Sequence, residues 1–279
     1  MKFRFVFLSL MTSATATISA ASPPPALQCL WASYHNFKIS ADHRELIFAD
    51  NGVLPFSNIT SEEFFKNFAV LAETPTAADQ MFFVPYKSGF ATDAHGNKIL
   101  PPPTEREEAG RIRFEPFFLK SYGDRPAVVE KDLVSVVWVD GKKVSFNRRY
   151  GAATALQKVS EQLSALLKTH PEYKKFVVSP LGGTYNWRVV AGTKNLSVHS
   201  FGVAIDINLD HSNYWKWEMK DGRITYNNAI PFEVVEVFER NGFIWGGKWH
   251  HYDTMHFEYR PELLISSDAC ATEFLKYRD

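Results

Sequence analysis

The sequence predicts an α+β fold in which a mainly antiparallel sheet is flanked by helices. Three observations lead to this prediction. The apolar run at 134–139 is followed by the turn signal Asp140-Gly141 and by alternating polar and apolar residues at 142–147, a pattern typical of a β-hairpin. Residues 152–168 repeat leucine and valine at helical spacing. Residues 231–241 begin with proline and end before a glycine, which indicates a second helix.

The first 21 residues resemble a signal peptide. Lys2 and Arg4 precede the apolar run at 5–11, and small residues then lead to a cleavage position near Ala21. The apolar run is shorter than the roughly 20 residues that a membrane span needs, so an uncleaved anchor is the lesser alternative. The sequence therefore predicts an exported protein, periplasmic or secreted, without a membrane span in the mature chain.

Residues 22–279 are expected to form one domain, because no Gly- or Ser-rich linker divides them. Within it we expect an amino-terminal elaboration at 22–125 and a core at 126–270. The prolines at 23–25 predict an extended linker, and the polar stretch at 92–111 predicts an exposed connection. A short apolar run, 176–179, predicts a further buried strand.

Charge and cysteine content narrow the possible functions. Removal of residues 1–21 would leave 29 basic and 31 acidic residues, and no basic stripe is present, so nucleic-acid binding is not expected. Cys29 and Cys270 lie near the two ends of the chain, and both a disulfide and two unpaired thiols are compatible with an exported protein. Neither cysteine has a histidine nearby in the sequence, so a thiol nucleophile is not expected.

Two histidines and two aspartates in two short segments suit a single zinc ion. His199 and Asp206 lie in SVHSFGVAID, and Asp253 and His256 lie in HYDTMH. A catalytic zinc site takes three protein ligands and leaves the fourth position to water, which predicts ligation by His199, Asp206 and His256. The remaining carboxylate, Asp253, is the candidate general base.

The local pattern around Asp206 supports this prediction. The spacing of His199 and Asp206 occurs twice more, within 35–50, but there charges fall on both sides of any strand. In contrast, residues 203–208 alternate so that the apolar side chains share one face and Asp206 lies on the other. Asp206 can therefore face a cleft while the opposite face packs on the core.

The second segment is expected to form a turn and then a strand. A turn at 253–256 lets Asp253 and His256 point the same way, and 257–259 can continue as a strand. The preceding IWGGKW predicts a buried strand and turn. Glu258 is expected to be structural or to support His256 from behind.

The segments SVHSFGVAIDIN and WGGKWHHYDTMHFEYRPEL resemble the zinc D-alanyl-D-alanine carboxypeptidase and L-alanyl-D-glutamate endopeptidase family of cell-wall peptidases. This family belongs with the lysostaphin and hedgehog group. The resemblance implies a hedgehog/DD-peptidase-like fold with one zinc ion in a sheet-floored cleft. It also implies His199, Asp206 and His256 as ligands, and Asp253 as the catalytic carboxylate. Arg188 is the candidate for the family's upstream arginine, although its surroundings depart from the commoner S-G-Y-R pattern.

The expected chemistry is peptide hydrolysis by zinc-activated water, with Asp253 accepting the proton. Arg188 would stabilise the oxyanion or bind a substrate carboxylate, and a surface ion pair is its structural alternative. Ser197 and His251 are candidate substrate-binding residues, with turn hydrogen bonding as the alternative for Ser197. His250 and His251 are also alternative imidazoles for the metal.

Two functions follow from the sequence. The first is an exported zinc peptidase that acts on peptidoglycan stem peptides, as a D-Ala-D-Ala carboxypeptidase or an L-Ala-D-Glu endopeptidase. The alternative is a non-catalytic, zinc-containing cell-wall binding domain of the same fold, which Asp253 disfavours because binding alone needs no base. The loops at 92–125 and 209–230 are expected to shape the specificity pocket, with Trp215 and Trp217 either contacting substrate or packing in the core. The sequence sets no oligomeric state.

Overall fold

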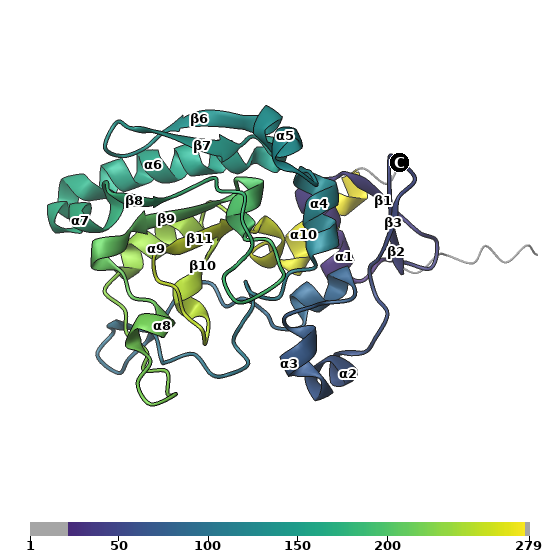
Figure 1. Ribbon diagram of the computed structural model, residues 1–279, viewed down its shortest axis with the longest axis horizontal. Coiled ribbons are helices and arrows are strands. Elements are labelled where there is room, and N and C mark those ends of the chain that lie inside the picture. The colour runs from purple at the N-terminus through teal and green to yellow at the C-terminus, as the bar shows by residue number, and fades with distance from the viewer. Residues whose placement is uncertain (1–21, 277–279) are drawn as a thin grey trace, which may run out of the picture.

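A four-stranded antiparallel sheet lies at the centre of the fold (Figure 1). The computed structural model describes residues 22–276. The central strands are β8 (Leu181–Gly183), β9 (Ala204–Asn208), β10 (Phe243–Trp245) and β11 (His256–Tyr259). They pair in the order β10-β11-β9-β8. The strands predicted around Asp206 and after Met255 are therefore confirmed, and so is the α+β class.

The predicted hairpin and both predicted helices are also present. Strands β6 (Leu133–Val137) and β7 (Lys143–Asn147) pair antiparallel across the turn at Asp140 and Gly141. Helix α6 (Ala152–Thr169) buries its leucine and valine face, and helix α9 (Phe232–Glu239) packs against it. Figure 1 shows the hairpin on one side of α6 and the central sheet on the other.

The strand predicted at 176–179 is wrong. Residues Lys174–Val177 form the short helix α7, and the chain enters β8 only after the cis peptide bond between Ser179 and Pro180. Phe176 and Val177 are buried as predicted, but from a helical turn. A short apolar run cannot distinguish a strand from a helical turn, because both can bury every residue of such a run.

The amino-terminal elaboration is more regular than its sequence predicts. The prediction of an extended linker at 23–25 is wrong for its last residue, because α1 begins at Pro25. Proline suits this first helical position, since its missing N–H costs no helical hydrogen bond. The first three strands form a separate antiparallel sheet. Two of the remaining helices are longer, α1 (Pro25–Tyr34) and α10 (Ser267–Lys276). The other remaining elements are short: β1 (Phe37–Ile39), β2 (Glu45–Phe48), β3 (Val53–Pro55), α2 (Ser61–Lys66), α3 (Phe68–Leu71), β4 (Ala91–Thr92), β5 (Lys98–Ile99), α4 (Glu115–Tyr122), α5 (Pro126–Val129) and α8 (Trp215–Glu218).

The connection at 92–111 is exposed only in its first part. Its last residues are buried, among them Glu108 and Ala109, and Ala109 packs in an apolar cluster with Ile244 and Trp249. Glu108 is buried despite its charge, and its Oε1 accepts hydrogen bonds from the backbone and ring of His251. This buried end places the following residues beside the central sheet.

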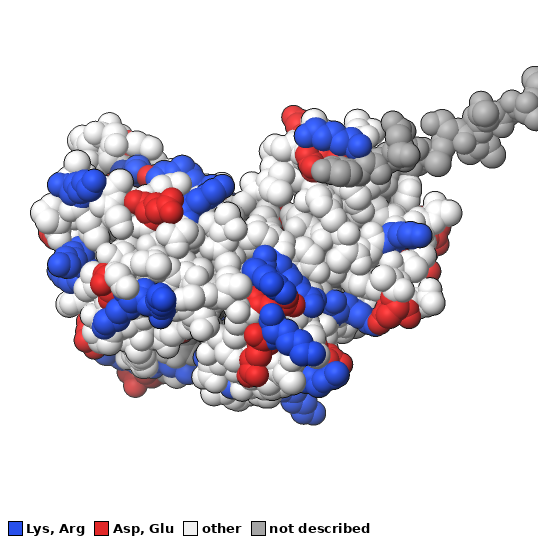
Figure 2. Space-filling model, turned by 90° about the horizontal axis from the view of Figure 1, so that it is seen from above, with Lys and Arg blue, Asp and Glu red and all other residues white. Residues whose placement is uncertain are grey.

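Side chains from both parts of the chain share the largest apolar core. It includes Leu30 and Phe118 from the amino-terminal elaboration, and Phe201 and Phe257 from the core segment. The rings of Phe118 and Phe201 have centroids 5.6 Å apart. On the molecular surface, Figure 2 shows basic and acidic side chains interspersed over the face it presents. In residues 22–276, no helix has the length and apolar character that crossing a membrane requires. The predicted signal peptide lies outside the described residues.

Cys29 and Cys270 form a disulfide that joins α1 to α10. The two residues are 241 positions apart in the sequence, and both side chains are buried. The bridge therefore closes nearly the whole described chain into one loop, which limits the conformations of the unfolded state.

Replacing both Cys29 and Cys270 by serine should lower the free energy of unfolding by about 2 to 5 kcal/mol, because the unfolded chain regains its freedom. Urea unfolding followed by circular dichroism measures this change. Wild-type protein treated with a reductant should show the same loss, whereas the double variant should not respond to the reductant. Equal stability of the oxidised wild type and the double variant would contradict the stabilising role of the bridge.

Candidate metal centre

Three potential ligand atoms converge where the paired strands β9 and β11 lie side by side. Nε2 of His199 lies 3.2 Å from Oδ1 of Asp206 and 3.2 Å from Nδ1 of His256. Nδ1 of His256 lies 2.8 Å from the same oxygen of Asp206. The structure therefore brings together the three residues that the sequence predicts as ligands, and their ligand atoms all lie within 4.8 Å of one another.

The strand register places two of these residues side by side. Asp206 of β9 pairs directly with His256 of β11, and on its other side it pairs with Gly183 of β8. A Cβ atom at Gly182 would lie 2.6 Å from Cβ of Asp206, so this position of β8 has no room for a side chain. The sheet therefore positions Asp206 through close backbone packing on both sides.

A short turn before β9 supplies the first histidine. Residues Val198–Phe201 form a 3-10 turn that ends at Gly202, whose φ of +66° suits glycine. Nδ1 of His199 donates a hydrogen bond of 2.7 Å to the backbone carbonyl of Thr184, which only accepts. This bond leaves Nε2 of His199 facing Asp206 with its lone pair.

A buried carboxylate fixes the second histidine. Nε2 of His256 lies 3.1 Å from Oε1 of Glu258, and Nη1 of Arg113 donates to the same oxygen at 2.9 Å. Arg260 lies behind, with its Nη1 3.5 Å from Oε2 of Glu258. Burial opposes ionisation of Glu258, but the charge of Arg113 and the bond with His256 outweigh it and lower the pKa of Glu258 to about 2. Glu258 therefore accepts a hydrogen bond from the N–H group at Nε2, and Nδ1 of His256 faces the cluster.

The arrangement requires a cation between the three atoms. Burial would raise the pKa of Asp206, but the positive charge of His199, when that ring is protonated, and hydrogen bonds with both histidines lower it well below its usual range. Burial disfavours charge on His256 as well, yet its bonds with Asp206 and Glu258 raise its pKa to about 10. Either a proton on His256 or a metal ion can meet this need. Two imidazoles and one carboxylate are a donor set that suits zinc, so the residues fit the ion that the sequence predicts.

Asp253 lies beside this cluster and has no compensating partner for one oxygen. Its Oδ1 is buried and makes no hydrogen bond within residues 22–276. Burial raises the pKa of Asp253 to about 6; the charge of His256 opposes this rise, and that of Asp206 adds to it. The turn predicted at 253–256 is present, with the backbone N–H of His256 donating to the carbonyl of Asp253 at 3.2 Å. Asp253 thus combines a buried acceptor with proximity to the cluster, as a general base requires.

Arg188 faces the same cavity from the loop after β8. The cavity has a volume of about 140 Å³, and its lining includes His199, Asp206, His256, Asp253, Arg188 and Arg113. We refer to it as the metal cavity. The side chain of Arg188 makes no hydrogen bond or ion pair with any residue of the described chain, which leaves its guanidinium available. Only its backbone is fixed, by Oγ of Ser200 and by the N–H of Ser197.

Ser197 and His251 occupy different places from the metal ligands. Oγ of Ser197 accepts a hydrogen bond from the backbone N–H of His199, which is the turn role considered for it, although Ser197 also lines the metal cavity. The ring of His251 bonds to Glu108, and it lines a neighbouring cavity instead. His250 likewise points to the carbonyl of Pro103, so neither histidine joins the cluster.

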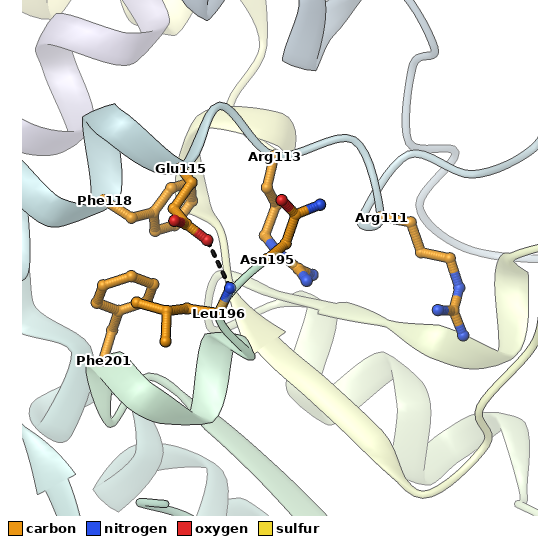
Figure 3. A pocket seen from close by; sticks show the side chains of 7 residues that line it. All are labelled: Arg111, Arg113, Glu115, Phe118, Asn195, Leu196 and Phe201. Atoms are coloured by element: carbon orange, nitrogen blue, oxygen red, sulfur yellow. Dashed lines mark hydrogen bonds between the residues drawn. The ribbon is translucent and has the colours of Figure 1, made fainter. Parts of the chain in front are cut away.

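Arg111 and Arg113 line the metal cavity from the amino-terminal elaboration and were not among the predicted site residues. A signal was present: Arg111, Arg113 and Glu115 alternate with Ile112 and Phe114, the pattern of an extended segment with one apolar face. In the structure Ile112 and Phe114 are buried, Arg111 and Arg113 line the metal cavity, and Figure 3 shows Glu115 turned toward the backbone of Leu196.

The comparisons with known proteins agree with the resemblance stated above. Residues 191–259, about a quarter of the chain, match a peptidase family model described as D-alanyl-D-alanine carboxypeptidase. This range contains His199, Asp206, Asp253 and His256. No curated protein and no solved structure matches the chain.

Replacing Glu258 by glutamine should weaken zinc binding by about 10- to 100-fold, because the amide no longer fixes the ring of His256 as a charged acceptor does. Competition with a chromogenic chelator measures the affinity. Glu161→Gln, a substitution at an exposed position of α6, is the matched control and should bind zinc as the wild type does. An unchanged affinity in folded Glu258→Gln protein would show that this carboxylate does not support the site.

Proposed function

We propose that this chain is an exported zinc metallopeptidase that hydrolyses peptide bonds in peptidoglycan stem peptides. One observation supports it above the others: two imidazoles and a carboxylate converge beside Asp253, inside the range that matches the peptidase family. In this proposal His199, Asp206 and His256 hold one zinc ion. The protein works in the periplasm or outside the cell after residues 1–21 are removed.

The residues of the chain divide the chemistry among them. When bound at these three residues, zinc supplies an acidic water and a polarised carbonyl. Asp253 accepts the proton of the attacking water on its buried, unpartnered oxygen, and it returns this proton to the departing amine. Glu258 and Thr184 hold the two imidazole rings in the orientation that ligation needs.

Arg188 recognises negative charge on the substrate. Its unpaired guanidinium can hold the oxyanion or a substrate carboxylate through two parallel hydrogen bonds. Ser197 shapes the turn that presents His199, and its place in the lining of the metal cavity permits a contact with substrate. His251 contacts substrate, if at all, from the neighbouring cavity.

A non-catalytic cell-wall binding domain is the alternative that the sequence left open. The environment of Asp253 argues against it, because burying a carboxylate oxygen without a partner costs free energy and brings no benefit to binding alone. In the proposed enzyme, residues 22–279 act as one unit: the segment 126–270 holds the metal, and the segment 22–125 completes the cleft.

Replacing Asp253 by asparagine should leave zinc bound and lower kcat/KM by about 100- to 10,000-fold, because the amide cannot accept the proton. Zinc content and hydrolysis of wall peptides are measured on the same preparation. Asp210→Asn, at an exposed aspartate, serves as the control. Wild-type activity should also fall as the pH drops through the pKa of Asp253, since only its ionised form is a base. Full activity of the asparagine variant would remove Asp253 from the mechanism.

Digestion of purified wall fragments should release peptides whose masses identify the bond that is cut. A chelator should stop the reaction, because the three ligands alone supply no nucleophile, and added zinc should restore it. Mass spectrometry of the products gives both results. Turnover that continues after verified removal of the metal would refute the zinc mechanism, and a lack of any peptide product would refute the proposed substrate.

A further inference from the structure

A second and larger cavity adjoins the metal cavity. Its volume is about 530 Å³, compared with about 140 Å³ for the metal cavity. We refer to it as the outer cavity. The two share lining residues: Arg111, Arg113, Val190, Ala191 and Tyr214. A group bound beside His199 and His256 therefore lies next to residues that also line the outer cavity.

The volumes indicate what kind of substrate the two cavities take together. Ligand pockets usually enclose about 300 to 1,000 Å³, so the metal cavity alone is small for a ligand and the outer cavity lies within the usual range. The outer cavity provides room for several residues of a peptide chain.

The shared wall is held in place from the amino-terminal elaboration. Oε2 of Glu115 accepts a hydrogen bond of 2.5 Å from the backbone N–H of Leu196, the contact drawn in Figure 3. Nδ2 of Asn195 donates to the carbonyl of Glu73 at 2.6 Å. These bonds join the loop that precedes His199 to two parts of the elaboration, so this wall is preorganised.

Arg111 is the cation best placed to contact a ligand in both cavities. Its Nε and Nη2 donate to the carbonyl of His251 at 3.0 and 2.6 Å, and its guanidinium lies 5.3 Å from the ring centre of Trp249. Its Nε also forms an ion pair of 3.4 Å with Oε2 of Glu108, and its side chain contacts the hydroxyl of Tyr214, while its Nη1 takes no part in the bonds to His251. A guanidinium held on these sides loses little freedom when it binds a carboxylate.

A second cation and an aromatic surface lie further into the outer cavity. Nζ of Lys216 lies 5.3 Å from the ring centre of Trp215. Nε1 of Trp215 is buried without a hydrogen bond, near the hydroxyl of Tyr214. Trp215 therefore lines a cavity, as one of its two predicted roles requires, whereas Trp217 is exposed. Three glutamates bring opposite charge to the same cavity: Glu73 and Glu105, which are exposed, and Glu108, which is buried.

We propose that the outer cavity binds a peptide extension of the substrate, several residues away from the bond that is cut, and that Arg111 and Lys216 bind its free carboxylates. This inference rests on the proposed function and specifies its substrate: an extended, carboxylate-bearing peptide in place of a terminal dipeptide. Exposed Ala69 of α3 lines the outer cavity and is absent from the lining of the metal cavity, so a bulky residue there obstructs only the extension.

The test measures binding separately from turnover. Zinc-loaded Asp253→Asn protein is titrated by calorimetry with a five-residue stem peptide, with L-alanyl-D-glutamate and D-alanyl-D-alanine, and with the five-residue peptide carrying amidated carboxyl groups. Adding Ala69→Trp should weaken binding of the five-residue peptide about tenfold and leave the dipeptides unchanged, because the indole overlaps sterically with the extension alone. Val70→Trp is the matched control, since Val70 is on the same helix, 65% exposed and outside the cavity lining.

The amidated peptide should bind about tenfold more weakly than the free acid, because it loses charged hydrogen bonds. Equal effects of Ala69→Trp and Val70→Trp would overturn the peptide subsite, and equal binding of the amidated and free peptides would overturn the role of the two cations. Failure of the proposed function has a different signature: wild-type protein would cut no peptide, whatever the calorimetry shows.

Discussion

The need for a cation between His199, Asp206 and His256 is the constraint on which the rest of the site depends. Each atom that faces the centre of this cluster is electron-rich, and the hydrogen bonds behind the two rings keep it so. Such a cluster is costly to bury unless positive charge fills it. Strand pairing and the hydrogen bonds behind the two rings keep the three ligand atoms together.

Antiparallel pairing of the strands places two of the three residues, Asp206 and His256, side by side. Because β9 lies between β8 and β11, Asp206 has a paired residue on each side. The turn before β9 brings His199 close to Asp206 and His256. The apolar face of β9 packs on the core below. The amino-terminal elaboration then adds Arg113, which secures Glu258 and through it the ring of His256. Segments far apart in the sequence thus act on the same ligand atoms.

Features that depend on one short segment of the chain were predicted correctly from the local sequence pattern. Alternation in 203–208 placed Asp206 opposite the core, and helical spacing located α6, since each depends on one segment alone. The hydrogen bond between Arg113 and Glu258 joins residues 145 positions apart, and no periodicity within a short segment predicts such a pairing. The helix α7 and buried Glu108 were missed for related reasons. The run at 176–179 was too short to show a period, and the burial of Glu108 depends on a hydrogen bond with His251, 143 positions away.

Anomalous diffraction at the zinc absorption edge tests the central claim most directly. Crystals of the full chain grown with one equivalent of zinc should show a single strong peak in contact with Nε2 of His199, the carboxylate of Asp206 and Nδ1 of His256, at the zinc–ligand distances of about 2.0 to 2.2 Å found in proteins. Coordinates in which zinc binds elsewhere, or in which these three side chains do not share an ion, would contradict the account.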